Sequence, residues 1–187
     1  MHETMLPREF PGGRLRKLRP SDHEAFQAYR GIPDLGRYQG WLPMSGAAAL
    51  DFLAEMGQAP LFATGQWVQL GIADLPSDCL VGDIGLYLSE DGHSGEVGFT
   101  LQPSAQGHGL ASRAVREALQ LFFSTTTVAR VLGITDERNL PSIRLLDRLG
   151  FEHIETRHVV FRDEPCTERV YALSRSAAIS SAELNRP

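Results

Sequence analysis

A glycine-rich turn, and a glutamate ten residues before it, are the parts of this chain best suited to chemistry. The turn is Gln106-Gly107-His108-Gly109-Leu110-Ala111, and it follows the alternating apolar segment Val97 to Leu101. After it, apolar residues recur at three- and four-residue steps, so the pattern predicts a strand, a turn and a helix N-terminus. The first turn of a helix has unpaired N–H groups and a dipole that favours an anion. Glycines leave room for a phosphate to approach, so the stretch predicts a phosphate site.

Two other glycine-rich phosphate-binding motifs match this turn less well. A Walker loop would end in Gly-Lys-Ser/Thr, which is absent here. A dinucleotide-binding fingerprint would need glycine or alanine where Ser112 stands. A plain strand-to-helix connection explains the local pattern as well as a phosphate site does, so the wider chain has to decide between them.

The composition indicates an ordinary globular protein. Of 187 residues, 42% are hydrophobic and 22% charged, which suits one domain, expected at 14–175 between a flexible leader (1–13) and a frayed tail (176–187). The net charge of −5 argues against a nucleic-acid partner and is compatible with an amine-bearing substrate. Cys79 and Cys166 lack metal or redox spacing. Without a long apolar segment, we expect no membrane contact and a cytoplasmic location.

Two early helices and an irregular segment are predicted in the first third of the chain. Ser21 and Glu24 form a capping-box pattern, and Ser45 is suited to cap a second helix. Between these helices, residues 31–46 are rich in glycine and proline. Tyr38 and Trp41 lie in this segment, and we interpret them as pocket walls that contact substrate.

The remaining segments predict a sheet with one parallel connection. Residues 62–73, 79–88 and the strand from Glu96 are joined by short turns, which indicates an antiparallel meander. A helix then leads to an apolar strand at 129–135, which predicts a right-handed parallel crossover. A last helix at 139–150 suits Asn139 as N-cap and Gly150 as C-terminal glycine. Two closing strands complete the pattern, at 151–161 and 168–174.

In their order, these segments resemble the GNAT superfamily of N-acetyltransferases. Gln106 to Ala111 matches its Gln/Arg-x-x-Gly-x-Gly/Ala signature. The branch that acetylates ribosomal-protein N-termini is also similar in several short segments: Leu18-Arg19-Pro20-Ser21-Asp22, Arg37-Tyr38 to Trp41, Val81-Gly82-Asp83-Ile84-Gly85, Asn139-Leu140-Pro141-Ser142 and Leu149-Gly150-Phe151. The resemblance extends to about Ser174.

This resemblance implies a fold and a co-substrate. The fold is α+β with three layers, a mixed, mostly antiparallel seven-stranded sheet with a splayed parallel pair, and about four flanking helices. Acetyl-CoA would lie between the splayed strands. Its pantetheine would pair with the backbone of Phe99, Thr100 and Leu101 and contact Asn139. The glycine-rich turn would hold its pyrophosphate, which makes these residues cofactor-binding candidates: Gln106, Gly107, His108, Gly109, Leu110, Ala111 and Ser112.

Transfer of an acetyl group to an amine requires a base and a proton for the departing thiolate. An alkyl amine is protonated at neutral pH, so a base must take its proton before it can attack. Glu96, at the head of the strand expected to bind the cofactor, is our candidate for this base. Members of the family often carry a tyrosine as proton donor seven residues after the motif asparagine, but Leu146 stands there. Ser142 is the substitute that we predict. No cysteine lies in these motifs, so direct transfer in a ternary complex is expected.

Two alternatives remain open from the sequence, a non-catalytic acyl-CoA-binding module and a nucleotide-binding oxidoreductase. The acceptor is also open, with protein N-termini, aminoglycosides, polyamines and small metabolite amines all compatible. We expect the exposed closing strands to be able to pair in a homodimer.

Overall fold

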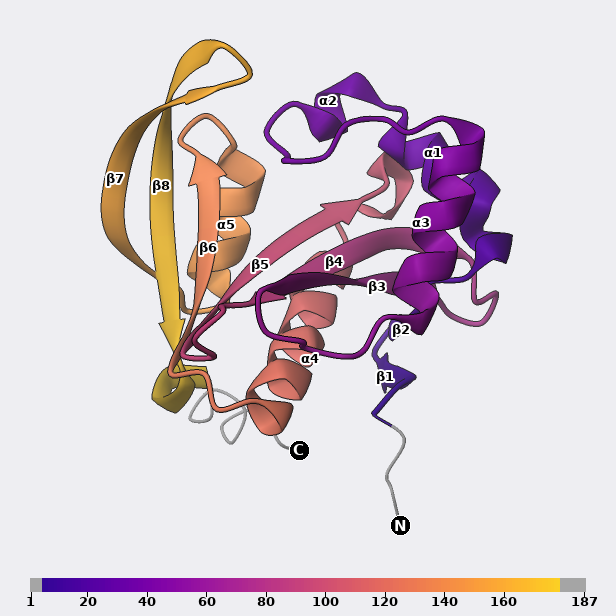
Figure 1. Ribbon diagram of the computed structural model, residues 1–187, viewed down its shortest axis with the longest axis horizontal. Helices are drawn as coiled ribbons and strands as arrows, with labels where there is room; N and C mark the ends of the chain where they lie inside the picture. Colours follow the sequence, from indigo (N-terminus) through magenta and orange to yellow (C-terminus); the bar gives the residue numbers. More distant parts are fainter. Residues whose placement is uncertain (1–4, 179–187) are drawn as a thin grey trace.

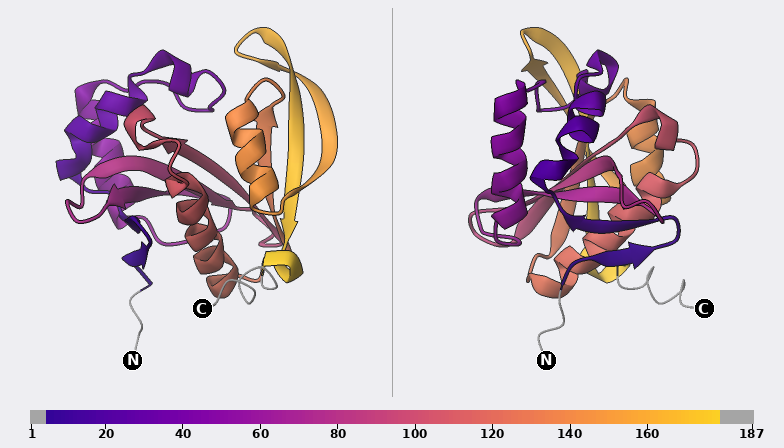
Figure 2. Two further views of the ribbon diagram at one scale, coloured as in Figure 1. Left: turned by 180° about the vertical axis from the view of Figure 1, so that it is seen from behind. Right: turned by 90° about the vertical axis from the view of Figure 1, so that its right-hand side faces the viewer.

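A mixed eight-stranded sheet with helices on both faces forms the protein, in a computed structural model that describes residues 5–178 (Figures 1 and 2). The strands are ordered β1-β2-β3-β4-β5-β6-β8-β7, and every adjacent pair except β5–β6 is antiparallel. Their bounds are Arg8–Phe10 (β1), Gly13–Lys17 (β2), Gln66–Asp74 (β3), Leu80–Leu88 (β4), Ser94–Leu101 (β5), Arg130–Asp136 (β6), Glu152–Phe161 (β7) and Glu164–Ser174 (β8).

The helices form the two outer layers of the three-layer arrangement. Short 3-10 turns lie at Pro20–Asp22 and Pro103–Ala105, and the helices are His23–Arg30 (α1), Pro33–Gly36 (α2), Gly46–Gln58 (α3), Leu110–Thr125 (α4) and Leu140–Arg148 (α5). Figure 2 shows α3 on one side of the sheet and α4 on the other. None of the helices within residues 5–178 is long and apolar enough to cross a membrane.

The parallel pair β5–β6 is splayed, as the resemblance to the GNAT superfamily implies. Pairing is limited to Ser94 with Arg130, Gly95 with Val131 and Glu96 with Leu132. Both strands continue beyond these pairs, β5 to Leu101 and β6 to Asp136. In Figure 1 the two ribbons diverge from a common base and form a V. A wedge is therefore open between the strands over the second half of β5.

The apolar face of α4 fills the space behind the sheet. Its residues at three- and four-residue spacing are all buried, and they pack with the inward side chains of β3, β4 and β5: Leu110, Ala114, Val115, Ala118, Leu119 and Phe122. This packing directs the N-terminus of α4 toward the wedge. The predicted helix therefore lies where the phosphate hypothesis requires it.

The ordered domain begins earlier than the sequence suggests, so the count of seven strands is corrected to eight. Within the predicted flexible leader, Arg8–Phe10 forms β1 and pairs with β2. Phe10 is buried, and the Arg8 guanidinium forms an ion pair with Glu117 of α4. Long-range contacts therefore order this segment, although its local pattern is weak. Residues 1–4 lie outside the described part.

Two further boundaries differ from prediction. The irregular segment at 31–46 contains the short helix α2, which raises the number of α-helices from four to five. Residues 175–178 form a helical turn in which Ala178 packs against the core, so the expected frayed tail starts later than Ser176. The rest of that tail, 179–187, is outside the described residues.

The capping box predicted at Ser21 is wrong. Helix α1 begins at His23, after a 3-10 turn, and its N-cap Asp22 makes no capping bond with its side chain. The Asp22 carboxylate instead accepts from both terminal nitrogens of Arg16, at 2.8 and 2.7 Å, and both residues are buried. A buried ion pair from β2 therefore determines how this helix starts.

Both predicted ends of α5 are confirmed. The Asn139 side chain accepts from the Ser142 amide at 3.4 Å. At the other end Gly150 has a φ of 85°, and the Phe151 amide donates to the Leu146 carbonyl. The left-handed residue and this back-bonding amide are features of a glycine-terminated helix. These local signals position α5 beside the wedge.

Candidate active site

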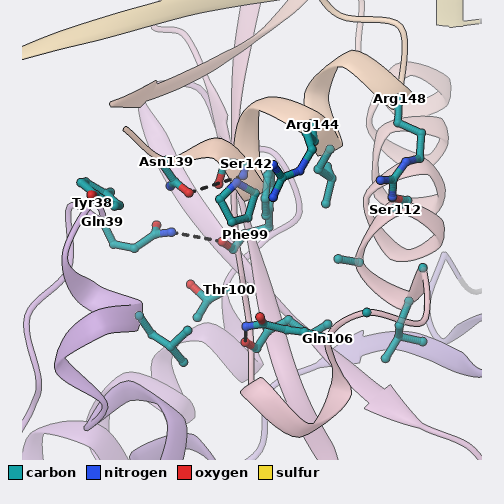
Figure 3. A pocket seen from close by; sticks show the side chains of 18 of the residues that line it. Tyr38, Gln39, Phe99, Thr100, Gln106, Ser112, Asn139, Ser142, Arg144 and Arg148 are labelled. Atoms are coloured by element: carbon teal, nitrogen blue, oxygen red, sulfur yellow. Dashed lines mark hydrogen bonds between the residues drawn. The ribbon is translucent and has the colours of Figure 1, made fainter. Parts of the chain in front are cut away.

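A cavity of about 440 Å³ occupies the wedge between β5 and α5 (Figure 3). Its walls come from the end of β5, the glycine-rich turn, the first turn of α4, one side of α5 and the segment around α2. Most of the predicted site residues line it: Tyr38, Phe99, Thr100, Leu101, Gln106, Gly107, Gly109, Leu110, Ala111, Ser112, Asn139 and Ser142. A smaller cavity of about 30 Å³ lies deeper between the strands, and Tyr38, Asn139 and Ser142 line both.

The wedge-facing edge of β5 presents backbone groups that no strand satisfies. The Gln102 amide donates to Val81 of β4, and backbone directions alternate along a strand, so Phe99 and Leu101 direct theirs into the wedge. Their carbonyls accept from side chains instead, Phe99 from Gln39 at 3.2 Å and Leu101 from Gln106 at 2.8 Å. This edge can therefore take an extended polar ligand as an added strand.

Thr100 does not fit the predicted backbone role. By the same alternation its backbone groups pair with β4, opposite Asp83. Its hydroxyl accepts from the indole nitrogen of Trp41 at 3.3 Å. Trp41 in turn lies over the Arg30 guanidinium, 4.2 Å from the ring centre, and does not line the cavity. Trp41 thus supports the wall from behind, which corrects its assignment as a pocket wall.

The end of the wedge that is predicted to bind phosphate presents main-chain amides. Gly107 and Gly109 have φ values of 85° and 73°, a left-handed conformation that glycine adopts without strain. Gly109 is the N-cap of α4, and among the described residues no side chain caps this helix end. The amides of Leu110, Ala111 and Ser112 therefore have no carbonyl partner within the helix. The predicted anion site is open.

His108 differs from its neighbours in this turn. It is exposed, and it is not among the residues lining the cavity. Its carbonyl accepts from the Arg113 guanidinium at 3.1 Å, and the same guanidinium also donates to the Pro11 carbonyl at 2.7 Å. These bonds hold the turn against the start of the chain. The cofactor assignment is therefore not supported for the His108 imidazole.

Helix α5 adds two arginines that the sequence interpretation missed. Arg144 and Arg148 line the cavity, and Figure 3 shows Arg148 pointing from α5 toward Ser112 of α4. The Arg148 guanidinium donates to the Ser112 hydroxyl at 3.2 Å, beside the first-turn amides. Their spacing of four residues places them on one helix face, a signal visible in the sequence. They bring positive charge to the anion site.

The outer rim of the cavity carries aromatic and charged side chains. The guanidinium groups of Arg37 and Arg138 lie 5.3 and 5.7 Å from the centre of the Tyr38 ring. Arg138 pairs with the buried carboxylate of Asp136 and lowers its pKa. At the tip of the β7–β8 hairpin, Arg162 donates to the carbonyls of Gln39 and Trp41, at 2.9 and 2.8 Å. These bonds join the hairpin to the segment after α2.

Glu96 lies at the last paired position before β5 and β6 separate. It lines neither cavity, and its side chain projects from the sheet face opposite Val97 and Leu101, which pack toward α4. Burial raises the pKa of the Glu96 carboxyl, the Glu168 carboxylate raises it further, and Arg157 lowers it. Carboxyl groups with a raised pKa are frequent at functional sites.

Comparison with known proteins decides the family. The model of the acetyltransferase (GNAT) domain matches residues 14–152. The chain belongs to the GNAT family of acetyltransferases. This class of enzymes uses acetyl-CoA as co-substrate.

Individual relatives support the same fold. The uncharacterized N-acetyltransferase p20 of Bacillus licheniformis is 26% identical over 140 residues, which cover 74% of this chain and 78% of that protein. The crystal structure of a GNAT acetyltransferase from Bacillus anthracis has a TM-score of 0.80 at 20% identity and covers 91% of this chain and 99% of that one. The ribosomal-protein alpha-N-acetyltransferase RimL, solved with coenzyme A, has a TM-score of 0.75 at 14% identity and covers 90% of this chain and 97% of its own.

Proposed function

We propose that this acetyltransferase moves an acetyl group from acetyl-CoA to a primary amine by direct attack in a ternary complex. The observation that carries the proposal is the wedge, which opens after the Glu96–Leu132 pair and leads to the uncapped N-terminus of α4. One end of this space suits a pyrophosphate. The other end lies next to the half-buried carboxylate of Glu96, which projects from the sheet face opposite α4.

The residues along the wedge match the parts of coenzyme A in order. The amides of Leu110, Ala111 and Ser112, with Arg148 beside them, would hold the pyrophosphate. The carbonyls of Phe99 and Leu101 would accept from the amide groups of the pantetheine. Since Gln39 and Gln106 occupy these carbonyls here, both side chains would have to give way or share them.

The chemical step needs one base and one polarising group from the protein. Acetyl-CoA supplies a thioester carbonyl, which a neutral amine attacks to form a C–N bond as the C–S bond breaks. Glu96 would take a proton from the bound ammonium, directly or through one water, to give the neutral amine that attacks, and its raised pKa favours this transfer. A backbone N–H near Phe99 to Leu101 would stabilise the oxyanion.

Ser142 is the residue that we assign to the departing thiolate. It is half-buried in the first turn of α5 and lines both cavities, so its hydroxyl lies where the wedge narrows. Leu146, the position where tyrosine is expected by resemblance, is buried in the core and lines only the smaller cavity. A thiol pKa near 8.5 makes the thiolate a tolerable leaving group, so the serine contribution is modest.

The surroundings of Glu96 indicate which class of acceptor the site could take. RimL acts on ribosomal proteins, and an alpha-amino group of a protein terminus would suit the same chemistry. A small diamine or other cationic amine fits the acidic surroundings of Glu96 and Glu168 equally well. We therefore propose a primary amine as acceptor.

Calorimetry with acetyl-CoA and a thiol-release assay with a panel of amines test this proposal. We expect acetyl-CoA binding, which Gly109→Trp abolishes because the indole would fill the anion site. We also expect turnover with at least one amine, which Glu96→Gln lowers. Acetyl-CoA binding without turnover of any amine would favour a non-catalytic acyl-CoA module. Tighter binding of NAD than of CoA would overturn the assignment.

A further inference from the structure

Two aromatic side chains stand in line with Glu96 across the open face of the sheet. Trp67 of β3 is in register with Tyr87 of β4, and Tyr87 is in register with Glu96 of β5. Residues opposite each other on adjacent strands share a face, so all three side chains project from the same side. The neighbouring residues Val68 and Val97 are buried on the α4 side. The aromatic pair therefore lies on the side of the sheet opposite α4.

The aromatic pair is arranged as a shelf. The Trp67 and Tyr87 ring centres are 5.5 Å apart, at an angle of 36°. The Trp67 side chain is 45% exposed, so a large aromatic surface is accessible to solvent on this face of the sheet. The indole lies over Gly85, where a Cβ would come within 3.1 Å of the ring. We refer to Trp67 and Tyr87 as the aromatic shelf.

Two glycines, which have no side chains, lie on the sheet face between the aromatic shelf and the wedge. Gly85 of β4 is in register with Gly98 of β5 on the same face. A Cβ added at Gly98 would meet no atom within 4 Å, and Gly98 lines the smaller cavity between the strands. The open face therefore communicates with the wedge at Gly98, one residue pair beyond Glu96.

The charged groups near Gly98 and Glu96 are mainly negative. Glu96 is close enough to the Glu168 carboxylate for the two to influence each other electrostatically, and Arg157 is the cation that opposes them. Arg157 is engaged by Glu155 at 2.8 Å and is in register with Glu168 across β7 and β8. The balance of charge beside Glu96 favours a cationic ligand.

We propose that the aromatic shelf is an acceptor subsite for a second cationic group, so that the acceptor is a diamine or polyamine. This inference rests on the proposed function. The faces of tryptophan and tyrosine attract ammonium groups. With strands about 4.8 Å apart, the two shelf residues lie roughly 5 and 10 Å from Glu96 along the row. An acceptor whose two amines are separated by a similar distance places one over the shelf and the other above Gly98, next to Glu96.

The test compares 1,5-diaminopentane with pentylamine, which has the same chain length and lacks the second cation. We expect the diamine to have a KM at least about fivefold lower than the monoamine, in line with a partly exposed cation–π contact. Trp67→Leu should raise the KM for the diamine to that of pentylamine and leave the KM for acetyl-CoA unchanged. Trp67→Phe and Tyr87→Phe keep aromatic faces and should retain the preference. Equal KM values for the two amines in the wild type, or an unchanged preference in Trp67→Leu, would overturn the proposal.

A binding measurement separates failure of the subsite from failure of the proposed function. The chain has two tryptophans, so a Trp41→Phe variant reports fluorescence from Trp67 alone. Titration with 1,5-diaminopentane should change this fluorescence at a lower concentration than pentylamine does. A fluorescence response without turnover would retain the subsite and overturn the acetyl transfer. Turnover with no difference between the amines in fluorescence would overturn the subsite alone.

Discussion

Glu96, the base that we propose, lies in an unfavourable environment for its charge. It stands where the strands separate, and burial together with Glu168 raises its pKa. A base needs its deprotonated form, so this environment costs stability but brings the carboxylate closer to the pKa at which proton transfer is efficient. Charged groups with perturbed pKa values are concentrated at functional sites.

Replacement of Glu96 should lower turnover and remove one limb of the pH profile. We expect Glu96→Gln to reduce kcat about 100-fold, the lower end for loss of a general base. In the wild type, kcat should fall as pH drops through the raised pKa, because the carboxyl becomes protonated. Steady-state thiol release from pH 5 to 8 measures both effects. An identical pH profile in the variant would show that the base is elsewhere.

Glu96→Gln should lower turnover but stabilise the folded state relative to the wild type as pH rises. Because the folded-state pKa is raised, the wild type loses stability as pH rises from the unfolded-state pKa through the folded-state pKa. Glutamine avoids this loss. The Tm advantage of Glu96→Gln over the wild type should therefore be greater at pH 7 than at pH 4. A constant Tm difference across this range would contradict the raised pKa.

Arg148 should contribute to coenzyme A affinity through charge. Its guanidinium lies beside the first-turn amides of α4 through its bond to Ser112. We expect Arg148→Ala to raise the Kd for CoA about tenfold in calorimetry, the lower end for a charged hydrogen bond, since the side chain is exposed. Arg130→Ala, at the far end of β6 from Asn139, is the control and should bind CoA normally. Equal effects of both variants would indicate only a general charge effect.

The glycine-rich turn depends on a left-handed backbone conformation, and a second glycine of the chain provides a control for it. Gly107 and Gly92 make a matched pair, because both have positive φ, at 85° and 71°, and a Cβ at either would meet nothing within 4 Å. Alanine at either position carries only the backbone strain of a left-handed residue. The two differ in place, since Gly92 lies in the turn between β4 and β5.

Alanine variants of this pair should therefore separate strain from binding. We expect Gly107→Ala and Gly92→Ala each to lose about 1 kcal/mol or more of unfolding free energy. Gly107→Ala alone should weaken CoA binding, because relaxation of the turn moves the amides of α4. Chemical denaturation and calorimetry on the same preparations measure the two quantities. Normal CoA affinity in Gly107→Ala would contradict the role of the turn.

A buried charge network joins the N-terminal helices to the centre of the sheet. Asp83 of β4 is fully buried and accepts from Arg30 at 3.1 and 2.6 Å, from Gln69 at 2.5 Å and from the Tyr29 hydroxyl. Arg30 also supports Trp41, whose indole bonds to Thr100 in the wedge. The network therefore connects the packing of α1 to the shape of the site.

Loss of Asp83 should destabilise the fold. Asp83→Ala leaves the Arg30 guanidinium buried without its carboxylate, which typically costs about 3–5 kcal/mol. Chemical denaturation should show this loss, with Asp83→Asn as a milder variant that keeps the volume. Glu155→Ala, which breaks the exposed pair with Arg157, is the control and should unfold as the wild type does. Similar unfolding of Asp83→Ala and the wild type would refute this assignment.

Much of the architecture was readable from local pattern. The alternation of Val97 to Leu101, the helical spacing of α4 and the ends of α5 at Asn139 and Gly150 all appear in the structure as expected. These features depend on periodicity and on glycine and asparagine chemistry, which neighbouring residues decide. The same local rules predicted a helix N-terminus after the turn, but they left a phosphate site and a plain strand-to-helix connection equally compatible with the pattern.

Long-range contacts decided the features that local pattern did not show. Arg8–Phe10 became a strand because β2 and α4 supply its partners. The capping box predicted at Ser21 did not form, because the helix starts after Asp22, whose carboxylate pairs with Arg16. Likewise the shelf of Trp67 and Tyr87 exists only because strand register brings them into line with Glu96. Register and burial join residues distant along the chain, and no short segment contains that information.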